Sequence, residues 1–465
     1  MKVTNKFRVL DRDDERGVTI VLVAIAMVAI IAMAAMSIDL VTLYLAREEA
    51  QRTADAAALA AARIMAAGGT TSVGQNFWGS MCGGINGWAT QAALAISVQN
   101  TIGGQQSTVA VTYSDGTTTN TDCSTLGAAF AVNPMVTVQV TPVSIPSFFS
   151  RIWGTRSSSV SATATAEAFN PSDSGNTGVS PNGIVTPVQP QCVKPWIVPN
   201  LDPGNAGSQL VNPATGQIRN PGVSTSGNGV AGIVGEQFIL FADCSPVANC
   251  TLIDPTPVVN KTGGGAPATP NMEYLPGAVI GPAAAVPSFC ATGITNYESA
   301  VAGCDQTTAY QCGLRAADSA SPNAVDLNEN PRGPTGDTAM GLACTLTNSA
   351  TIPLSGQDQL ISTAYPFVAL AGNKNPLNIP NSPVVNSNSL MTLPIYDQVA
   401  AGNITLANNP VTIVGFLQVF VNDVSATDGS VQVTVINVAG CGSSAFTNPP
   451  LTTNSPVPVR LITPH

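Results

Sequence analysis

Few side chains in this chain could carry catalysis. Its only histidine is the terminal residue, His465, whereas Ser–His–Asp triads, Cys–His dyads and histidine-containing zinc sites need a positioned imidazole. Asp243 and Asp305 each stand beside a cysteine, but neither belongs to a recognisable pair of catalytic carboxylates. The lysines outside the N-terminal arm, which a Ser/Lys mechanism would need, are Lys194, Lys261 and Lys374. We therefore predict that the protein is not an enzyme and uses no cofactor, metal ion or small-molecule substrate.

Two short motifs suggest ligand chemistry but lack the surroundings that it needs. The stretch DVSAT (423–427) resembles the metal-adhesion motif of von Willebrand A domains, yet the chain ends too soon after it for such a domain. The stretch GNGVAG (227–232) fits the dinucleotide-binding pattern G-x-G-x-x-G, but no apolar strand precedes it. Both stretches are predicted to be loops.

The ten cysteines all follow an apolar N-terminal run, and no two are spaced as CxxC. This spacing disfavours a zinc ribbon or a thioredoxin-like motif. An even number of cysteines favours disulfide bonds formed in an oxidising compartment, and buried free thiols are the alternative. The candidate disulfide cysteines are Cys82, Cys123, Cys192, Cys244, Cys250, Cys290, Cys304, Cys312, Cys344 and Cys441.

The composition is that of an exported protein. Only 9% of the residues are charged, against about 25% in an average soluble domain. Proline and glycine are abundant, with 35 and 42 residues, which is typical of short strands joined by turns. The net charge of −10 and the scarcity of Lys and Arg exclude nucleic acid as a partner, because phosphate binding needs clustered basic residues.

Residues 17–38 carry no charge. A helix of this length, rising about 1.5 Å per residue, spans the roughly 30 Å hydrocarbon layer of a membrane. Basic residues are more frequent before this segment than after it, so the positive-inside rule places the arm 1–16 in the cytoplasm and the rest of the chain outside it. These residues are Lys2, Lys6, Arg8, Arg12 and Arg16 before the segment, and Arg47 and Arg52 after it.

The same segment also has features of a cleaved signal peptide. Residues 32–34, Ala-Met-Ala, have the small-x-small form of a signal peptidase site. Against cleavage, the helical pattern continues without a breaker as far as Gly68. Processing at Gly17, as in type IV pilins, is disfavoured because Leu22 stands where those proteins carry Glu. A membrane anchor is the leading interpretation, and a secreted protein is the alternative.

Residues 39–67 are predicted to continue the helix, because they contain no Pro or Gly and are rich in Ala. Small residues recur at every fourth position on one face, which would let another helix approach closely. This face is predicted to be a helix-association surface; packing on the protein's own ectodomain is the alternative. The residues of the face are Ala46, Ala50, Ala54, Ala58 and Ala62.

The N-terminal region resembles the TadE/TadG-like Flp pilus-assembly family. The resemblance rests on Arg16-Gly17, the apolar run, and the stretch SIDLVTLYLAREEAQRTADAAALAAA, in which Asp39 and Asp55 match the two acidic positions of the family. It covers residues 16–63. The resemblance implies a single-pass bacterial inner-membrane protein that contacts the lipid bilayer and other Tad/Flp pilus-assembly proteins, or itself.

Beyond the helix, residues 68–169 are predicted to form an α+β region. The stretch 136–169 is similar to the segment that follows in many family members, with alternating strands at 136–140 and 159–168. Between them, FFSRIW (148–153) is predicted to be a short helix. Its aromatic and aliphatic side chains are predicted to lie in the core, and contact with the membrane surface is the alternative. These side chains are Phe148, Phe149, Ile152 and Trp153.

Residues 170–187 are predicted to be a linker and 188–465 a β-rich, Pro/Gly-rich ectodomain. The clearest strands are 236–242, 411–421 and 430–440, the last two forming a hairpin. The fold class predicted is membrane-anchored α+β, with a long N-terminal helix followed by a β-rich ectodomain that contains disulfides. The function predicted is a non-enzymatic component of Flp pilus assembly; the alternative is a secreted or surface-exposed adhesin with a cleaved signal peptide.

Overall fold

The structure is a computed structural model of the chain. It describes residues 13–131, 134–149, 157–168, 188–190, 192–205, 208–213, 216–225, 232–242, 259–262, 266–277, 294–303, 335–349, 352–384, 387–398, 411–441, 451–453 and 459–462. The predicted linker 170–187 lies outside them. The chain forms two compact units. Unit 1 contains Met1–Ala57, Leu94–Ala110 and Val138–Ala164, and unit 2 contains Ala58–Ala93, Val111–Thr137 and Thr165–His465.

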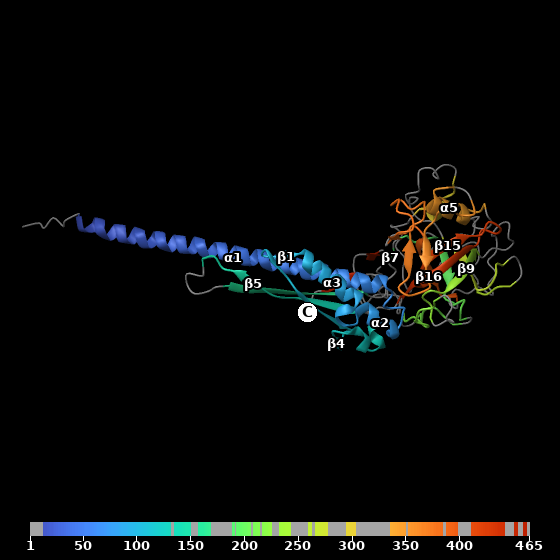
Figure 1. Cartoon of the computed structure of the whole chain (residues 1–465), viewed down its shortest axis with the longest axis horizontal. Coiled ribbons are helices and arrows are strands. Elements are labelled where there is room, and N and C mark those ends of the chain that lie inside the picture. The colour runs from blue at the N-terminus through green and yellow to red at the C-terminus, as the bar shows by residue number, and fades with distance from the viewer. Residues whose placement is uncertain are drawn as a thin grey trace, which may run out of the picture. The chain divides into compact units, whose positions relative to one another are not determined.

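One uninterrupted helix, α1 (Asp13–Ala67), forms the N-terminal part of the chain (Figure 1). It ends in a Schellman motif. Gly69 adopts a positive φ of 69°, its amide donates to the carbonyl of Ala66 (3.2 Å), and the amide of Thr70 donates to that of Met65 (3.0 Å). The predicted long apolar helix, ending just before Gly68-Gly69, is confirmed.

Unit 1 combines the first part of α1 with segments that follow it in sequence. These segments come from α3 (Trp88–Gln99), β1 (Thr101–Ile102), β2 (Gln105–Gln106), β5 (Met135–Pro146) and β6 (Ser157–Ala168). The strands β5 and β6 confirm the two strands expected at 136–140 and 159–168.

The strand β6 is built for close packing on one face. Every second residue from Val160 to Ala168 is buried, and four of these five are alanine. Because alternate side chains of a strand point to the same face, this face presents almost no side-chain volume. A helix can therefore lie close to it. The strand belongs to a five-stranded sheet of order β18-β6-β5-β3-β4, with β3 at Val109–Ser114, β4 at Thr119–Asn120 and β18 at Val459–Ile462.

A disulfide between Cys82 and Cys123 fixes the helical part of unit 2. It joins α2 (Gln75–Cys82) to the short 3₁₀ helix η2 (Cys123–Thr125). The other 3₁₀ helices are η1 (Gly84–Asn86) and η3 (Ala128–Ala131). Cys192, Cys344 and Cys441 are also disulfide-bonded. None of the cysteines in the described ranges is free, which confirms a disulfide-containing ectodomain. The remaining candidate cysteines, Cys244, Cys250, Cys290, Cys304 and Cys312, lie outside the described residues.

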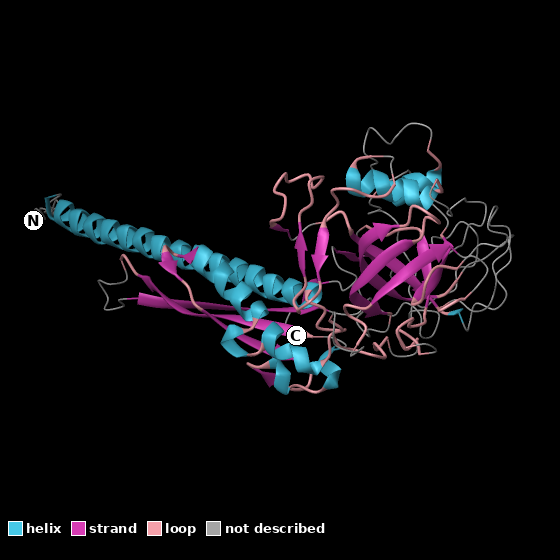
Figure 2. Ribbon diagram, turned by 45° about the vertical axis from the view of Figure 1, so that its right-hand side comes forward, coloured by secondary structure: helices cyan, strands magenta, loops and turns pink. Residues whose placement is uncertain are grey.

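The β-rich part of unit 2 is a closed barrel (Figure 2). Its strands follow the order β10-β8-β14-β15-β16-β9, and β8 pairs with β14, and β9 with β10, in parallel. The strands expected at 236–242, 411–421 and 430–440 are found, and the last two form the expected antiparallel pair. The barrel strands are β8 (Trp196–Pro199), β9 (Gln237–Ala242), β10 (Asn271–Pro276), β14 (Leu390–Tyr396), β15 (Ile413–Val424) and β16 (Val431–Gly440).

Two short helices, α4 (Asn296–Ala302) and α5 (Asp337–Thr347), pack on one another beside the barrel. The buried ammonium group of Lys194 donates to the carbonyl oxygens of Val301 and Gly303 at the end of α4 (2.6 and 2.5 Å). A cation at a helix C-terminus is favourable, because the last carbonyls carry partial negative charge.

Two smaller sheets lie outside the barrel. One pairs β7 (Val188–Pro190) with β17 (Leu451–Thr453), and the other pairs β12 (Val368–Leu370) with β11 (Gln359–Ile361) and β13 (Pro383–Val384).

Within unit 2, the end of α1 is held by the barrel strand β16. The buried side chain of Asn437 donates from Nδ2 to the carbonyl oxygen of Ala66 (2.8 Å), and its Oδ1 accepts from the hydroxyl of Ser72 (2.7 Å). The hydroxyl of Tyr365 donates to the carbonyl of Gly68. The last carbonyls of a helix lack the regular helical partners. Tyr365 supplies a donor for Gly68, and Asn437 adds a second donor for Ala66, whose carbonyl also accepts from Gly69.

We expect Asn437→Ala to lower the free energy of unfolding by about 2–3 kcal/mol, since it removes two buried hydrogen bonds of about 1–1.5 kcal/mol each. The matched control is Asn422→Ala on β15, whose side chain donates to Thr434 at a half-buried position; its loss should be under about 1 kcal/mol. Denaturant unfolding of the detergent-solubilised chain, followed by tryptophan fluorescence, measures both. Equal losses in the two variants would contradict this account of the helix end.

Candidate functional site at the C-terminal end of the apolar segment

Asp39 is the first charged residue after the apolar segment, and it faces inward. Its side chain is only 7% exposed, while its neighbours Ile38 and Leu40 are exposed. Burying a carboxylate is unfavourable unless hydrogen-bond donors surround it. A specific partner is therefore expected, and unit 1 supplies one.

The partner of Asp39 is the backbone just beyond β5. Its Oδ1 accepts from the amide of Phe148 (2.9 Å), and its Oδ2 accepts from the amide of Phe149 (3.0 Å). We call this arrangement the Asp39 clamp. The two amides follow Pro146, the last residue of β5, so they no longer belong to the strand. Two hydrogen bonds to one ionised group are stronger than bonds between neutral groups, and they fix the start of the β5–β6 loop on α1.

The rings of Phe148 and Phe149 point away from the core. Phe148 is 63% exposed and Phe149 is 36% exposed, and both lie in a bend rather than a helix. The predictions that these two side chains are core residues and begin a helix are therefore wrong. Their backbone amides bind Asp39 of α1, and both side chains stay exposed. Ile152 and Trp153 lie outside the described residues.

A second polar residue of α1, Glu49, holds the β1–β2 turn. Its Oε2 accepts from the amide of Gly103 (2.7 Å). Gly103 and Gly104 both have positive φ, as a two-residue hairpin turn requires, and this turn leaves the Gly103 amide free to reach the helix. Sequence reasoning missed Glu49. The Gly103-Gly104 pair indicates a tight turn, but it does not show which acidic side chain would bind the amide of that turn.

Asp55, the second acidic position of the family resemblance, lies next to Gln51 on the same helix. The Nε2 of Gln51 donates to Oδ1 of Asp55 (2.8 Å) and to the carbonyl of Thr163 on β6 (3.4 Å). Asp55 thus orients the side chain that reaches β6. Arg16 and Gly17 lie inside α1, in the turns that follow its first residue.

The alanine face of α1 is covered within the chain. Each of its five residues is at most 1% exposed. In this structure the face is internal packing, which is the alternative left open by the sequence. A partner helix could reach it only if that packing opened. The residues concerned are Ala46, Ala50, Ala54, Ala58 and Ala62.

Two buried acids lie next to barrel strands in the sequence. Asp202 follows β8, and Glu236 precedes β9. Oδ1 of Asp202 accepts from the amides of Gly204 (2.9 Å) and Asn205 (3.1 Å). Its Oδ2 and both carboxyl oxygens of Glu236 have no hydrogen-bond partner among the described residues. Burial, and then the neighbouring Asp202 carboxylate, raise the pKa of Glu236 to about 8. In the described part of the chain, no group of three or more His, Cys, Asp or Glu side chains could hold a metal ion.

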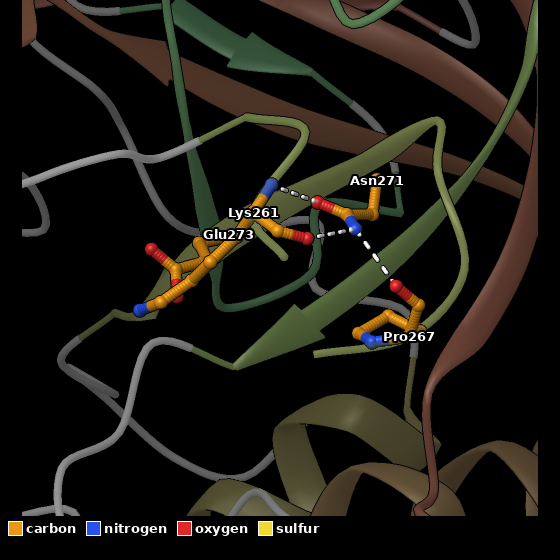
Figure 3. Close-up of polar contacts among 4 residues, drawn as sticks. All are labelled: Lys261, Pro267, Asn271 and Glu273. Carbon is orange, nitrogen blue, oxygen red and sulfur yellow. Dashed lines mark hydrogen bonds and ion pairs between the residues drawn. The ribbon is translucent and has the colours of Figure 1, made fainter. Parts of the chain in front are cut away.

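Lys261 takes part in a structural network beside β10 (Figure 3). Its ammonium group pairs with Oε1 of Glu273 (2.6 Å). The side chain of Asn271 accepts from the amide of Lys261 (2.9 Å) and donates to the carbonyls of Lys261 (3.0 Å) and Pro267 (2.9 Å). These bonds tie residues 261 and 267 to the start of the strand. Lys194 and Lys261 therefore both have structural partners.

The described residues thus contain a long apolar helix, α1, and a β-rich remainder with disulfides. Residues 17–63 match the family model described as putative Flp pilus-assembly TadE/G-like. The match lies on α1 and contains Asp39, the alanine face and Asp55. Over these residues the chain is similar to the TadE/G-like Flp pilus-assembly proteins that the family model describes. No curated protein and no solved structure matches the chain in these comparisons.

We expect Asp39→Ala to release the start of the β5–β6 loop. The loss of two charge-assisted bonds should raise the exchange rates of the Phe148 and Phe149 amides by about ten- to a hundredfold. Hydrogen exchange with mass spectrometry measures this in the detergent-solubilised chain. The matched control is Asp55→Ala, which removes an α1 carboxylate that does not contact the loop. If these two amides exchanged at the same rate in Asp39→Ala as in Asp55→Ala, the clamp would have no role in holding the start of the loop.

The raised pKa of Glu236 sets a direction for the dependence of stability on pH. Its usual value is 4.5 and its folded value is about 8. Between these values the folded chain keeps a proton that the unfolded chain has released, so the free energy of unfolding should fall as pH rises from 4.5 to 8 and level off above. Glu236→Gln should flatten this slope. Denaturant unfolding across this range measures it, and parallel slopes for the two proteins would contradict the assignment.

Proposed function

We propose that this chain is a membrane-anchored, non-enzymatic component of Flp pilus assembly that acts through protein–protein contacts in the cell envelope. The observation that carries the proposal is the family match to residues 17–63, which lies on a helix long and apolar enough to cross a membrane. Other pilus-assembly proteins, or a second copy of this chain, are the partners proposed. No small-molecule substrate is expected.

The exposure of α1 supports an anchor. Within the described residues, one helix is long and apolar enough to span a membrane, and the most apolar part of it is almost entirely exposed. Large aliphatic side chains are exposed from Ile20 to Leu45. Such a surface is unfavourable in water. An apolar stretch of this length matches the thickness of a lipid bilayer.

The disulfides and the distribution of basic residues support the orientation proposed. Disulfides persist in oxidising compartments, and the described cysteines, all after residue 80, are bonded. The excess of Lys and Arg in the arm 1–16 favours a cytoplasmic N-terminus by the positive-inside rule. We therefore propose a single pass through the inner membrane, with the barrel on the extracytoplasmic side.

A non-enzymatic role is supported by the way this chain uses its reactive residue types. Lys194 closes the end of α4, and Lys261 pairs with Glu273. The only imidazole belongs to His465. The proposal therefore assigns the ectodomain a binding role rather than a catalytic one.

The proposal is tested by deleting the gene in its host and imaging Flp pili. Pili should be lost, and wild-type protein should restore them. A version in which residues 17–38 are replaced by a cleavable signal peptide should be secreted and should not restore pili, because it has lost the anchor. Normal pili in the deletion strain, or full rescue by the secreted version, would overturn the proposal.

N-terminal sequencing of the mature protein separates the anchor from the alternative, an adhesin released by signal peptidase. Cleavage after Ala34 would leave Asp39 and everything after it in place. The fold is therefore compatible with both the anchored component and the released adhesin. An intact start supports the anchored component. A start at Ala35 would favour the adhesin.

A further inference from the structure

The Asp39 clamp fixes residues 148 and 149, at the start of the β5–β6 loop, at a defined position along α1. Because the amides of Phe148 and Phe149 bind the carboxylate of Asp39, the two rings lie at the level where the uncharged run of the helix ends. Asp39 follows Thr19 by 20 residues, which corresponds to about 30 Å along a helix and equals the thickness of the hydrocarbon layer.

The apolar surface of α1 continues past this level. Leu40, Val41, Tyr44 and Leu45 are all exposed, and the next charged residue is Arg47. Residues beyond Asp39 would therefore occupy the polar interfacial layer, since the bilayer with its headgroups is about 40–45 Å thick. Tyrosine is enriched in that layer, and the position of Tyr44 agrees with it.

The backbone just after β5 is suited to the interfacial layer of a membrane. An irregular segment can approach the hydrocarbon region only if its backbone donors are satisfied inside the protein, because little water is present to replace them. The two amides that follow β5 meet this condition through Asp39. The same bonds allow a buried carboxylate to lie at this depth, since ionisable groups near the membrane need internal partners.

We propose that the exposed rings of Phe148 and Phe149 insert into the lipid interface beside α1, and that Asp39 positions them there. The partner is the bilayer rather than a protein, because the exposed rings lie at the same level along α1 as its exposed side chains Ile38 and Leu40. The chain thus meets the membrane twice, through α1 and through the rings of Phe148 and Phe149 just after β5. This inference rests on the membrane anchor of the proposed function.

The test uses the full chain in vesicles of phosphatidylethanolamine and phosphatidylglycerol that contain a tagged phospholipid. The photoreactive residue p-benzoylphenylalanine replaces Phe148, Ile30 or Leu377 in separate proteins. Ile30 is an exposed residue of the apolar segment, and Leu377 is an equally exposed apolar residue of unit 2. Labelling by lipid should be several-fold higher at positions 148 and 30 than at position 377.

The outcomes separate this inference from the proposed function. No labelling at position 30 would mean that the anchor itself fails. Strong labelling at position 30, with labelling at position 148 no higher than at position 377, would overturn the loop contact alone. A crosslink from position 148 to protein instead of lipid would also overturn it.

The role of Asp39 is tested in the chain that carries the photoreactive residue at position 148. Asp39→Ala should lower lipid labelling toward the level of position 377, because the loop is no longer held at the interface. Asp55→Ala should leave it unchanged. Labelling at position 30 should be the same in all three backgrounds, which shows that the variants still insert. Undiminished labelling at position 148 in Asp39→Ala would exclude Asp39 as the positioning residue.

Discussion

The burial of a small-residue face on α1 is the constraint on which the rest of the structure depends. The helix runs without a break from Asp13 to Ala67, and its alanine face is covered by the chain itself. Alanine side chains leave room for backbone to approach closely, and the buried face of β6, which is also mostly alanine, suits the same close packing. Large side chains at these positions would separate the elements and remove the contacts between them.

Close packing brings backbone groups of other segments against the helix, and each of them needs a partner. Polar residues of α1 supply partners at intervals along unit 1: Asp39 for the start of the β5–β6 loop, Glu49 for the β1–β2 turn and Gln51 for β6. At the other end, in unit 2, the barrel residue Asn437 satisfies a carbonyl of the helix. The acids of the helix therefore act as hydrogen-bond acceptors within the fold.

Asp39 lies where this packing reaches the end of the uncharged segment of α1. A carboxylate at the end of a membrane span is usually explained as a stop signal, with its charge in the headgroup layer. In this chain it also accepts two backbone hydrogen bonds and is almost fully buried. The family resemblance marked this residue without assigning it a role. In the structure Asp39 attaches the backbone just after β5 to the helix at the end of its uncharged run.

Local patterns in the sequence determined the helix, its end at Gly68-Gly69 and several strands, and residues 17–63 carry the resemblance to the TadE/G-like family. They succeed because hydropathy, helix propensity and strand alternation act between residues a few positions apart. Only the tertiary structure decided that Asp39 meets amides 109 and 110 residues away, that the alanine face is internal and that the barrel includes parallel pairs. It also showed that the exposed rings of Phe148 and Phe149 are not core residues. These outcomes depend on contacts between distant segments, and neither residue type nor periodicity specifies which segments meet.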